Sequence, residues 1–393
     1  MNKLNTFLAV GALLVSLGEA KAQAIDEVLR NIERNNKELQ ASAKDAEAAR
    51  MEVQTQNNLE DPSVEYSPFY TKGISGMSSS ELVVSQSFDF PTLYAARHSS
   101  VKLQKEVVDR QYQVERRELL LSAKNLCLDL IMLNKQQAML SLRKKNAGDL
   151  LTLFDERLKQ GDAGVLDINK IKMELMNVQT EVAQNNAAHR TALQKLLAMN
   201  GNLPIEFSAS EYPQTKAPAG YDELYDEVVA TDATLQMADA SARAAEKNVS
   251  VQRQNWLPKL EVGYRRNTSI DENSNGFLIG GSLPLFSNRK KNKIARAQAV
   301  SARLRLDDVR LQTEADVQSR YNELRQLDEA MRAYDVTLMT NTLSLLKEAV
   351  TEGQISVIDY YTEADNVYNK LMAYYEVENR YQKLLAEIYK NRL

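Results

Sequence analysis

The chain contains two stretches of equal length and similar pattern, KQGDAGVLD at residues 159–167 and TEGQISVID at residues 351–359. Gly161 and Asp167 of the first stretch recur as Gly353 and Asp359 of the second, at a constant spacing of 192 residues. A fixed spacing on this scale indicates two copies of one structural unit. Each stretch has the Gly and Asp of a turn, and long segments flank it. We therefore expect each stretch to connect two helices.

The long segments are defined by the absence of Pro and Gly, the two residues that cost most inside a helix. Ala, Leu, Glu, Lys, Arg and Gln are abundant in these segments, which predicts long helices. As a single helix, the longest segment would extend about 100 Å. Its apolar residues recur every three or four positions, the spacing typical of coiled-coil packing. The segments are residues 23–61, 92–147, 165–200, 221–257, 287–352 and 354–393.

Four shorter runs alternate between apolar and polar residues and predict β-strands in two hairpins. Each is about the length that a tilted strand needs to cross an outer membrane. The alternative is a pair of soluble hairpins that cap a helical bundle. The residues expected to face lipid are Val64, Tyr66, Leu82, Val84, Phe88, Leu260, Val262, Phe277, Ile279 and Leu283. Because four strands cannot close a barrel and open edges are not tolerated in lipid, we expect three copies to supply twelve strands.

The order helix, hairpin, long helix, return helix occurs twice, which predicts the domain organisation. Residues 1–22 form a signal peptide, with Lys3 before an apolar run and Ala20-Lys21-Ala22 as its cleavage site. No other apolar stretch of the sequence is long enough for a membrane helix. We expect a first repeat at residues 23–200, a connector at 201–220 and a second repeat at 221–393.

The composition argues against several classes of function. The 49 basic and 53 acidic residues nearly balance, so the sequence gives no indication of nucleic-acid binding. Two histidines and one cysteine offer no credible set of metal ligands or catalytic residues. We therefore expect no enzymatic activity, no metal site and no cofactor.

The strand-to-helix junctions, SFDFP at residues 87–91 and LPLFSNR at 283–289, resemble those of the TolC family of outer-membrane efflux channels. The resemblance extends from Gln23 to Leu393 and is closest to the shorter, cation-efflux members. It implies a mainly α-helical fold with four strands per chain and a homotrimer whose barrel contacts outer-membrane lipid. A long helical extension would reach through the periplasm to an adaptor protein and an inner-membrane pump. The family's glycine after the junction is replaced here by Thr92 and Ser287.

The resemblance also assigns roles to the two turns. As a family member, the chain would be a passive exit duct, carrying drugs or metal ions out of the periplasm. Its adaptor would dock on the turns, at the exposed apolar residues Val165, Leu166, Ile355 and Val357. The turn residues Gly161, Gly164, Asp167 and Gly353 would belong to the same docking tips. Asp359 and Glu363 lie four residues apart on one helix face and would form the pore gate. Three copies would bring these carboxylates together in a ring.

Two other classes of protein use long helices. One is a trimeric coiled-coil surface or structural protein, and the other is the periplasmic adaptor of the same kind of pump. The doubled helix–hairpin–helix order favours the channel, because a fibre needs no paired hairpins and an adaptor carries a single helical hairpin.

Overall fold

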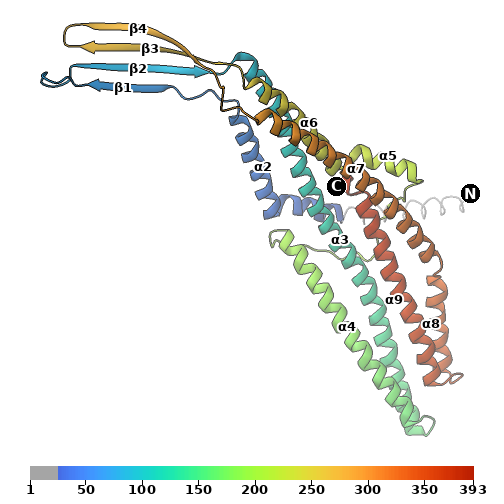
Figure 1. Ribbon diagram of the computed structural model, residues 1–393. Coiled ribbons are helices and arrows are strands. Elements are labelled where there is room, and N and C mark those ends of the chain that lie inside the picture. Colours follow the sequence, from blue (N-terminus) through green and yellow to red (C-terminus); the bar gives the residue numbers. More distant parts are fainter. Residues whose placement is uncertain (1–24) are drawn as a thin grey trace, which may run out of the picture. The chain divides into compact units, whose positions relative to one another are not determined.

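The computed structural model describes residues 25–393, so the predicted signal peptide lies outside the described residues. The chain is mainly helical and has one four-stranded sheet, which confirms the predicted fold class (Figure 1). Residues 25–35 are helical. They are followed by α2 Lys37–Thr55, β1 Ser63–Phe69, β2 Ser79–Phe88, α3 Pro91–Gln160, α4 Val165–Met199, α5 Tyr221–Thr231, α6 Ala233–Gln254, β3 Lys259–Ser269, β4 Asn273–Ser282, α7 Lys291–Arg332, α8 Val336–Thr351, α9 Val357–Ile388 and the short 3-10 helix Lys390–Arg392.

The chain divides into two compact units. The strand unit comprises Ser42–Val114 and Thr231–Thr313, and it holds the sheet and the helical segments next to it. The hairpin unit comprises, of the described residues, 25–41, Glu115–Ala230 and Glu314–Leu393. Both repeats therefore contribute to each unit.

The sheet of the strand unit is antiparallel throughout, in the order β1-β2-β3-β4. Each repeat supplies one hairpin, and β2 and β3 join the two hairpins at the middle of the sheet. The strands β1 and β4 pair on one side only, so their outer backbone groups form two open edges. On the helices below, Leu93 and Ala96 of α3 pack against Val251 of α6.

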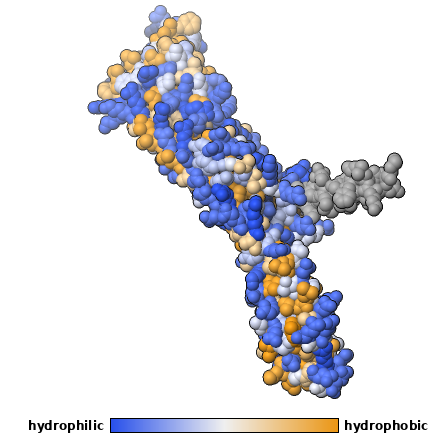
Figure 2. Space-filling model, turned by 90° about the vertical axis from the view of Figure 1, so that its right-hand side faces the viewer, coloured by the Kyte–Doolittle hydropathy of each residue, from blue (hydrophilic) through white to orange (hydrophobic). Residues whose placement is uncertain are grey.

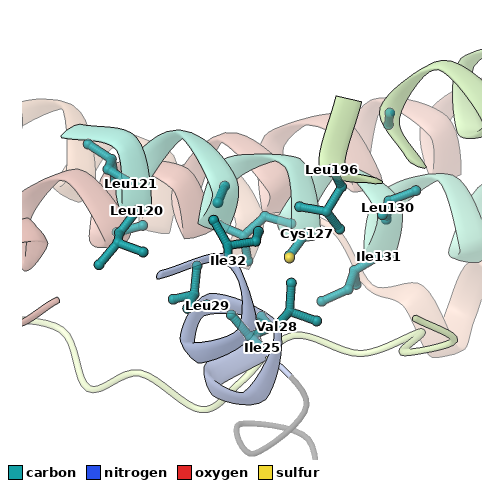
Figure 3. Packing of buried hydrophobic residues seen from close by; sticks show 14 of the residues in the cluster. Ile25, Val28, Leu29, Ile32, Leu120, Leu121, Cys127, Leu130, Ile131 and Leu196 are labelled. Atoms are coloured by element: carbon teal, nitrogen blue, oxygen red, sulfur yellow. The ribbon is translucent and has the colours of Figure 1, made fainter. Parts of the chain in front are cut away.

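The hairpin unit contains two helical hairpins, α3 with α4 and α8 with α9 (Figure 1). One apolar cluster joins the helix at residues 25–35 to α3 and α4, with Ile32, Leu128 and Leu196 among its fully buried side chains (Figure 3). A second cluster joins α3, α4, α8 and α9 and includes Ile171, Val350 and Leu371. The connector at 201–220 has no helix or strand, and Phe207 and Tyr212 pack on the first cluster.

Three of the segments expected to be single helices are interrupted, which corrects the sequence prediction. The breaks fall at Asn36, Asp232 and residues 333–335. At each break an Asn or Asp side chain accepts a hydrogen bond from the backbone N–H three residues later: from Leu39 to Asn36, from Leu235 to Asp232 and from Leu338 to Asp335, each 2.8 Å long. These are N-caps, which end one helix and start the next without Pro or Gly. In contrast, α3 continues through Gly148 for 70 residues.

Candidate functional site

The strand register places the predicted lipid-facing residues on one face of the sheet. Val64 lies opposite Val84, Val84 opposite Tyr264, and Tyr264 opposite Phe277. Because side chains alternate along a strand, this row fixes the faces of all four strands. Nine of the ten predicted residues share this face: Val64, Tyr66, Leu82, Val84, Phe88, Leu260, Val262, Phe277 and Ile279. Leu283 lies just beyond the end of β4.

The opposite face of the sheet is polar. Arg265 and Glu81 form an ion pair of 2.9 Å, and the Ser85 hydroxyl donates to Glu261 at 2.6 Å. Phe277 and Ile279 on the apolar face are 91% and 87% exposed. Bulky apolar side chains therefore point outward, while charged groups pair with one another across the other face.

The two hairpin tips share a backbone geometry that only glycine adopts readily. Gly161 has φ +86° and Gly353 has φ +78°, both in the left-handed region. The first residues of each return helix are then held by an Asp. The Gly164 N–H donates to Asp167 Oδ2 at 3.0 Å, and the Ser356 hydroxyl donates to Asp359 Oδ2 at 2.7 Å. The recurrence of Asp at a spacing of 192 residues thus reflects a shared capping role.

The two tips differ in what they expose. Val165 and Leu166 of the first tip are 62% and 77% exposed, as a docking surface requires. In contrast, Val357 of the second tip is 1% exposed, and Ile355 packs against the same apolar cluster. The expectation that Val357 is exposed was therefore wrong: its side chain joins the core of the hairpin unit. Figure 2 shows hydrophobic patches on the surface toward the ends of the helical hairpins.

The two candidate gate residues lie on the exposed surface of α9. Asp359 and Glu363 are both exposed, and the Asp359 carboxylate also accepts a hydrogen bond from the hydroxyl of Ser356, the N-cap residue of α9. Thr362 hydrogen-bonds the Ile358 carbonyl oxygen at 2.8 Å. The role of the two acids in a gate stays a prediction.

A buried ion cluster in the hairpin unit was missed by sequence analysis. Arg143 of α3 contacts Glu174 at 2.6 Å and Glu181 at 3.2 Å, both on α4, and Asp365 of α9 at 2.8 Å. The guanidinium also lies 4.9 Å from the centre of the Tyr368 ring. Three carboxylates share one cation. Because these residues come from three helices, no local sequence pattern relates them.

Burial dominates the electrostatics of this cluster. The Glu174 side chain is 2% exposed, and its desolvation raises the pKa of the carboxyl group in spite of the neighbouring Arg143. Asp365 adds to the rise by like-charge repulsion. Elsewhere in the hairpin unit, burial raises the pKa of the Cys127 thiol to about 12, so this thiol stays protonated and unreactive.

The described residues include neither a metal-ligand group nor a membrane-spanning helix. Residues 25–393 contain no cluster of three or more His, Cys, Asp or Glu side chains that could hold a metal ion. No helix in the same range is both long and apolar enough to cross a membrane.

Comparison with known proteins gives a family match for the second repeat. The model of the outer membrane efflux protein family matches residues 224–390. This segment is similar to outer membrane efflux proteins. It contains β3, β4 and the helices α6 to α9, so the match covers the strand hairpin and the second helical hairpin together.

One curated relative of this chain is the nickel and cobalt resistance protein CnrC of Cupriavidus metallidurans. It is 32% identical over 106 residues, which span 26% of this chain and 25% of the relative's own length. The similarity therefore extends over only about a quarter of either protein.

Solved structures share the fold over nearly the whole chain. The outer-membrane channel OprN has a TM-score of 0.76 and 14% identity, and the alignment covers 94% of this chain and 89% of that chain. The Campylobacter jejuni CmeC outer membrane channel has a TM-score of 0.72 and 15% identity, with 94% and 85% covered. The fold predicted from the sequence is thereby confirmed, and the family match at residues 224–390 agrees with the resemblance of the sequence.

Proposed function

We propose that this chain is one protomer of a passive exit duct in the outer membrane, formed by three copies. The observation that carries the proposal is a four-stranded sheet with one exposed apolar face and two open edges, attached to long helical hairpins. In lipid every backbone polar group needs a partner inside the protein. Three copies would give the backbone groups at both open edges hydrogen-bond partners, because β4 of one copy would pair with β1 of the next.

The two faces of the sheet suit opposite surroundings. Phe277, Ile279 and their neighbours on the apolar face would contact lipid. The polar face, with the Glu81–Arg265 pair, would line the water-filled interior. Residues 23–200 and 221–393 would act as two repeats, and each copy would extend its helical hairpins into the periplasm.

The hairpin tips would dock a periplasmic adaptor, which connects the duct to an inner-membrane pump. Such a duct performs no catalysis, and the energy for transport comes from the pump. Because the relative from Cupriavidus metallidurans is named for resistance to nickel and cobalt, metal ions are a candidate cargo alongside drugs.

Membrane fractionation and complementation test the proposal together. The protein should be found in the outer-membrane fraction and be extracted only by detergent, as a trimer with no stable folded monomer. Deletion of its gene should sensitise the host to exported drugs or metal ions, and the wild-type gene should restore resistance. Recovery of a folded monomer from the soluble periplasm would contradict the proposal.

A further inference from the structure

The helices of the strand unit follow the same order as its strands. Arg50 of α2 pairs with Asp109 of α3 at 2.5 Å, and Glu106 of α3 pairs with Arg243 of α6 at 2.8 Å. Arg303 of α7 lies 3.6 Å from Glu246 of α6. The helix order is therefore α2-α3-α6-α7, parallel to β1-β2-β3-β4. One end of the row is formed by β1 and α2 of the first repeat, and the other end by β4 and α7 of the second repeat.

At the middle of this row, the first and second repeats of the same chain meet. There β2 and α3 of the first repeat meet β3 and α6 of the second. Asp89, at the end of β2, is buried and lies 3.9 Å from Lys259, at the start of β3. Arg97 also pairs with Asp89, at 2.6 Å. An acid on the first repeat thus meets a base on the second repeat at the foot of the sheet.

The corresponding junction of the second repeat, between β4 and α7, is exposed and strongly basic. Within residues 25–393 no acidic side chain lies within 4.0 Å of the basic cluster, defined as Arg289, Lys290, Lys291 and Lys293. These cations stand at the start of α7, where the helix dipole disfavours positive charge. Leu285 and Phe286 beside them are 61% and 86% exposed. At the junction after β2, by contrast, Leu93 is buried and Phe90 is half-buried.

The open end of the first repeat, formed by α2 and the segment between α2 and β1, carries the opposite charge. Asp45, Glu52 and Asp61 are exposed, and no basic side chain of the described part of the chain forms an ion pair with them. Leu59 is also exposed at this junction. By contrast, the neighbouring Glu60 already has a partner in Lys259.

Strand direction brings these two ends together when copies pair. The chain enters β1 at Ser63 and leaves β4 at Ser282, so antiparallel pairing of β4 with β1 of the next copy sets these two ends at the same foot of the sheet. The basic cluster begins seven positions after Ser282, and Asp61 lies two positions before Ser63. The exposed Leu285 and Phe286 would be covered by the same contact.

We propose that the basic cluster of one copy binds Asp61 and Glu52 of the next copy, so that an ion-pair cluster closes each boundary between copies. It would reproduce the Asp89–Lys259 boundary, again with the acid on the first repeat and the base on the second. The difference is that the acid follows its strand in the Asp89–Lys259 boundary and precedes its strand in the proposed one. The inference rests on the proposed function, in which copies pair through β4 and β1. The basic cluster could instead contact anionic lipid headgroups. We favour a second copy because the β4 edge needs a partner strand and because the opposite end of the row supplies matching acids.

Charge reversal on the full-length protein in detergent tests this inference. The Lys291→Glu/Lys293→Glu variant and the Glu52→Lys/Asp61→Lys variant each place like charges at the boundary. Each should lower the trimer-to-monomer ratio at low salt by at least about tenfold, because juxtaposed like charges cost several kcal/mol. The protein with all four changes should recover trimers. Lys172→Glu, which alters an exposed residue of α4, is the control.

Cross-linking gives a second readout that does not depend on stability. Cysteines at Asp61→Cys and Lys291→Cys should form disulfides between copies, without interference from Cys127, which is buried. Trimers that persist in every charge variant, with no cross-link, would overturn the ion-pair cluster and leave the proposed channel intact. Loss of binding to vesicles containing phosphatidylglycerol, with trimers unaffected, would assign the basic cluster to lipid instead. A wild-type protein that is never trimeric would contradict the proposed function itself.

Discussion

The two hairpin tips share a turn but expose different surfaces. In both, a glycine with positive φ is followed by an Asp that caps the return helix. The first tip then exposes Val165 and Leu166, whereas the second places Val357 in the core of the hairpin unit. The tips therefore differ at Val165 and Val357, whereas Leu166 and Ile358 at the next position are exposed in both, because the surroundings of each tip decide which apolar residue is free. The first tip is the better candidate for a partner, and the second is better suited to hold the helices together.

The largest effect should come from the exposed tip. Val165→Asp with Leu166→Asp should leave trimers and export intact yet abolish efflux, because the adaptor would lose its apolar contact. The measurement is drug or metal resistance in a strain that depends on this channel. The matched control is Met173→Asp, an exposed apolar position farther along α4. Full resistance in the double variant would show that the adaptor does not use this tip.

The buried tip should respond in its stability instead. Val357→Asp should destabilise the fold by about 3 kcal/mol or more, because it buries a charge without a partner. Its neighbour Ile358 is exposed, so Ile358→Asp should change stability by less than about 0.5 kcal/mol. Thermal unfolding in detergent would compare the two variants, and equal losses would mean that Val357 is not a core residue.

The gate prediction depends on the second tip alone. Three copies would crowd Asp359 and Glu363 around one axis, so reconstituted channels should be cation-selective and blocked by trivalent ions from the periplasmic side. The Asp359→Ala/Glu363→Ala variant should lose most of this block and keep its trimer. Asp365 is unsuitable as a control because it pairs with Arg143, so the exposed Glu348→Ala serves instead. Persistent block in the double variant would move the gate elsewhere.

The turn glycines should show a smaller and equal effect at the two tips. Gly161→Ala and Gly353→Ala should each cost about 1–2 kcal/mol, because a Cβ is strained at positive φ. Gly164 has φ −90°, an ordinary value, so Gly164→Ala should cost less. Chemical unfolding of the three variants provides the comparison. A larger loss at Gly164 than at Gly161 would contradict the geometry.

The smallest effect concerns the acid that the first hairpin buries. Burial raises the pKa of Glu174. The corresponding residue of the second hairpin, 192 positions later, is Asn366, which is exposed. A carboxyl group with a raised folded-state pKa stabilises the fold below its unfolded pKa, and this contribution is lost as pH rises through the folded value. Glu174→Gln should therefore flatten the dependence of the melting temperature on pH in the mildly acidic range and above. Asn366→Gln should leave it unchanged, and an unaltered profile in Glu174→Gln would contradict the assignment.

Local patterns in the sequence were sufficient for the elements of the fold. Missing Pro and Gly predicted the helices, and strict alternation predicted which strand residues share a face. The breaks at Asn36, Asp232 and Asp335 were missed because Asn and Asp also occur within helices. Only a capping hydrogen bond distinguishes an Asn or Asp that starts a new helix from one that lies within a helix.

The sequence by itself determined the apolar face of the sheet and the turn glycines, because each depends on spacing within one segment. The tertiary structure decided the rest. Val357 is buried, and Arg143 gathers Glu174, Glu181 and Asp365, because segments far apart in the chain meet there. Burial and electrostatic pairing depend on neighbours in space, and those neighbours are fixed only when the helices pack.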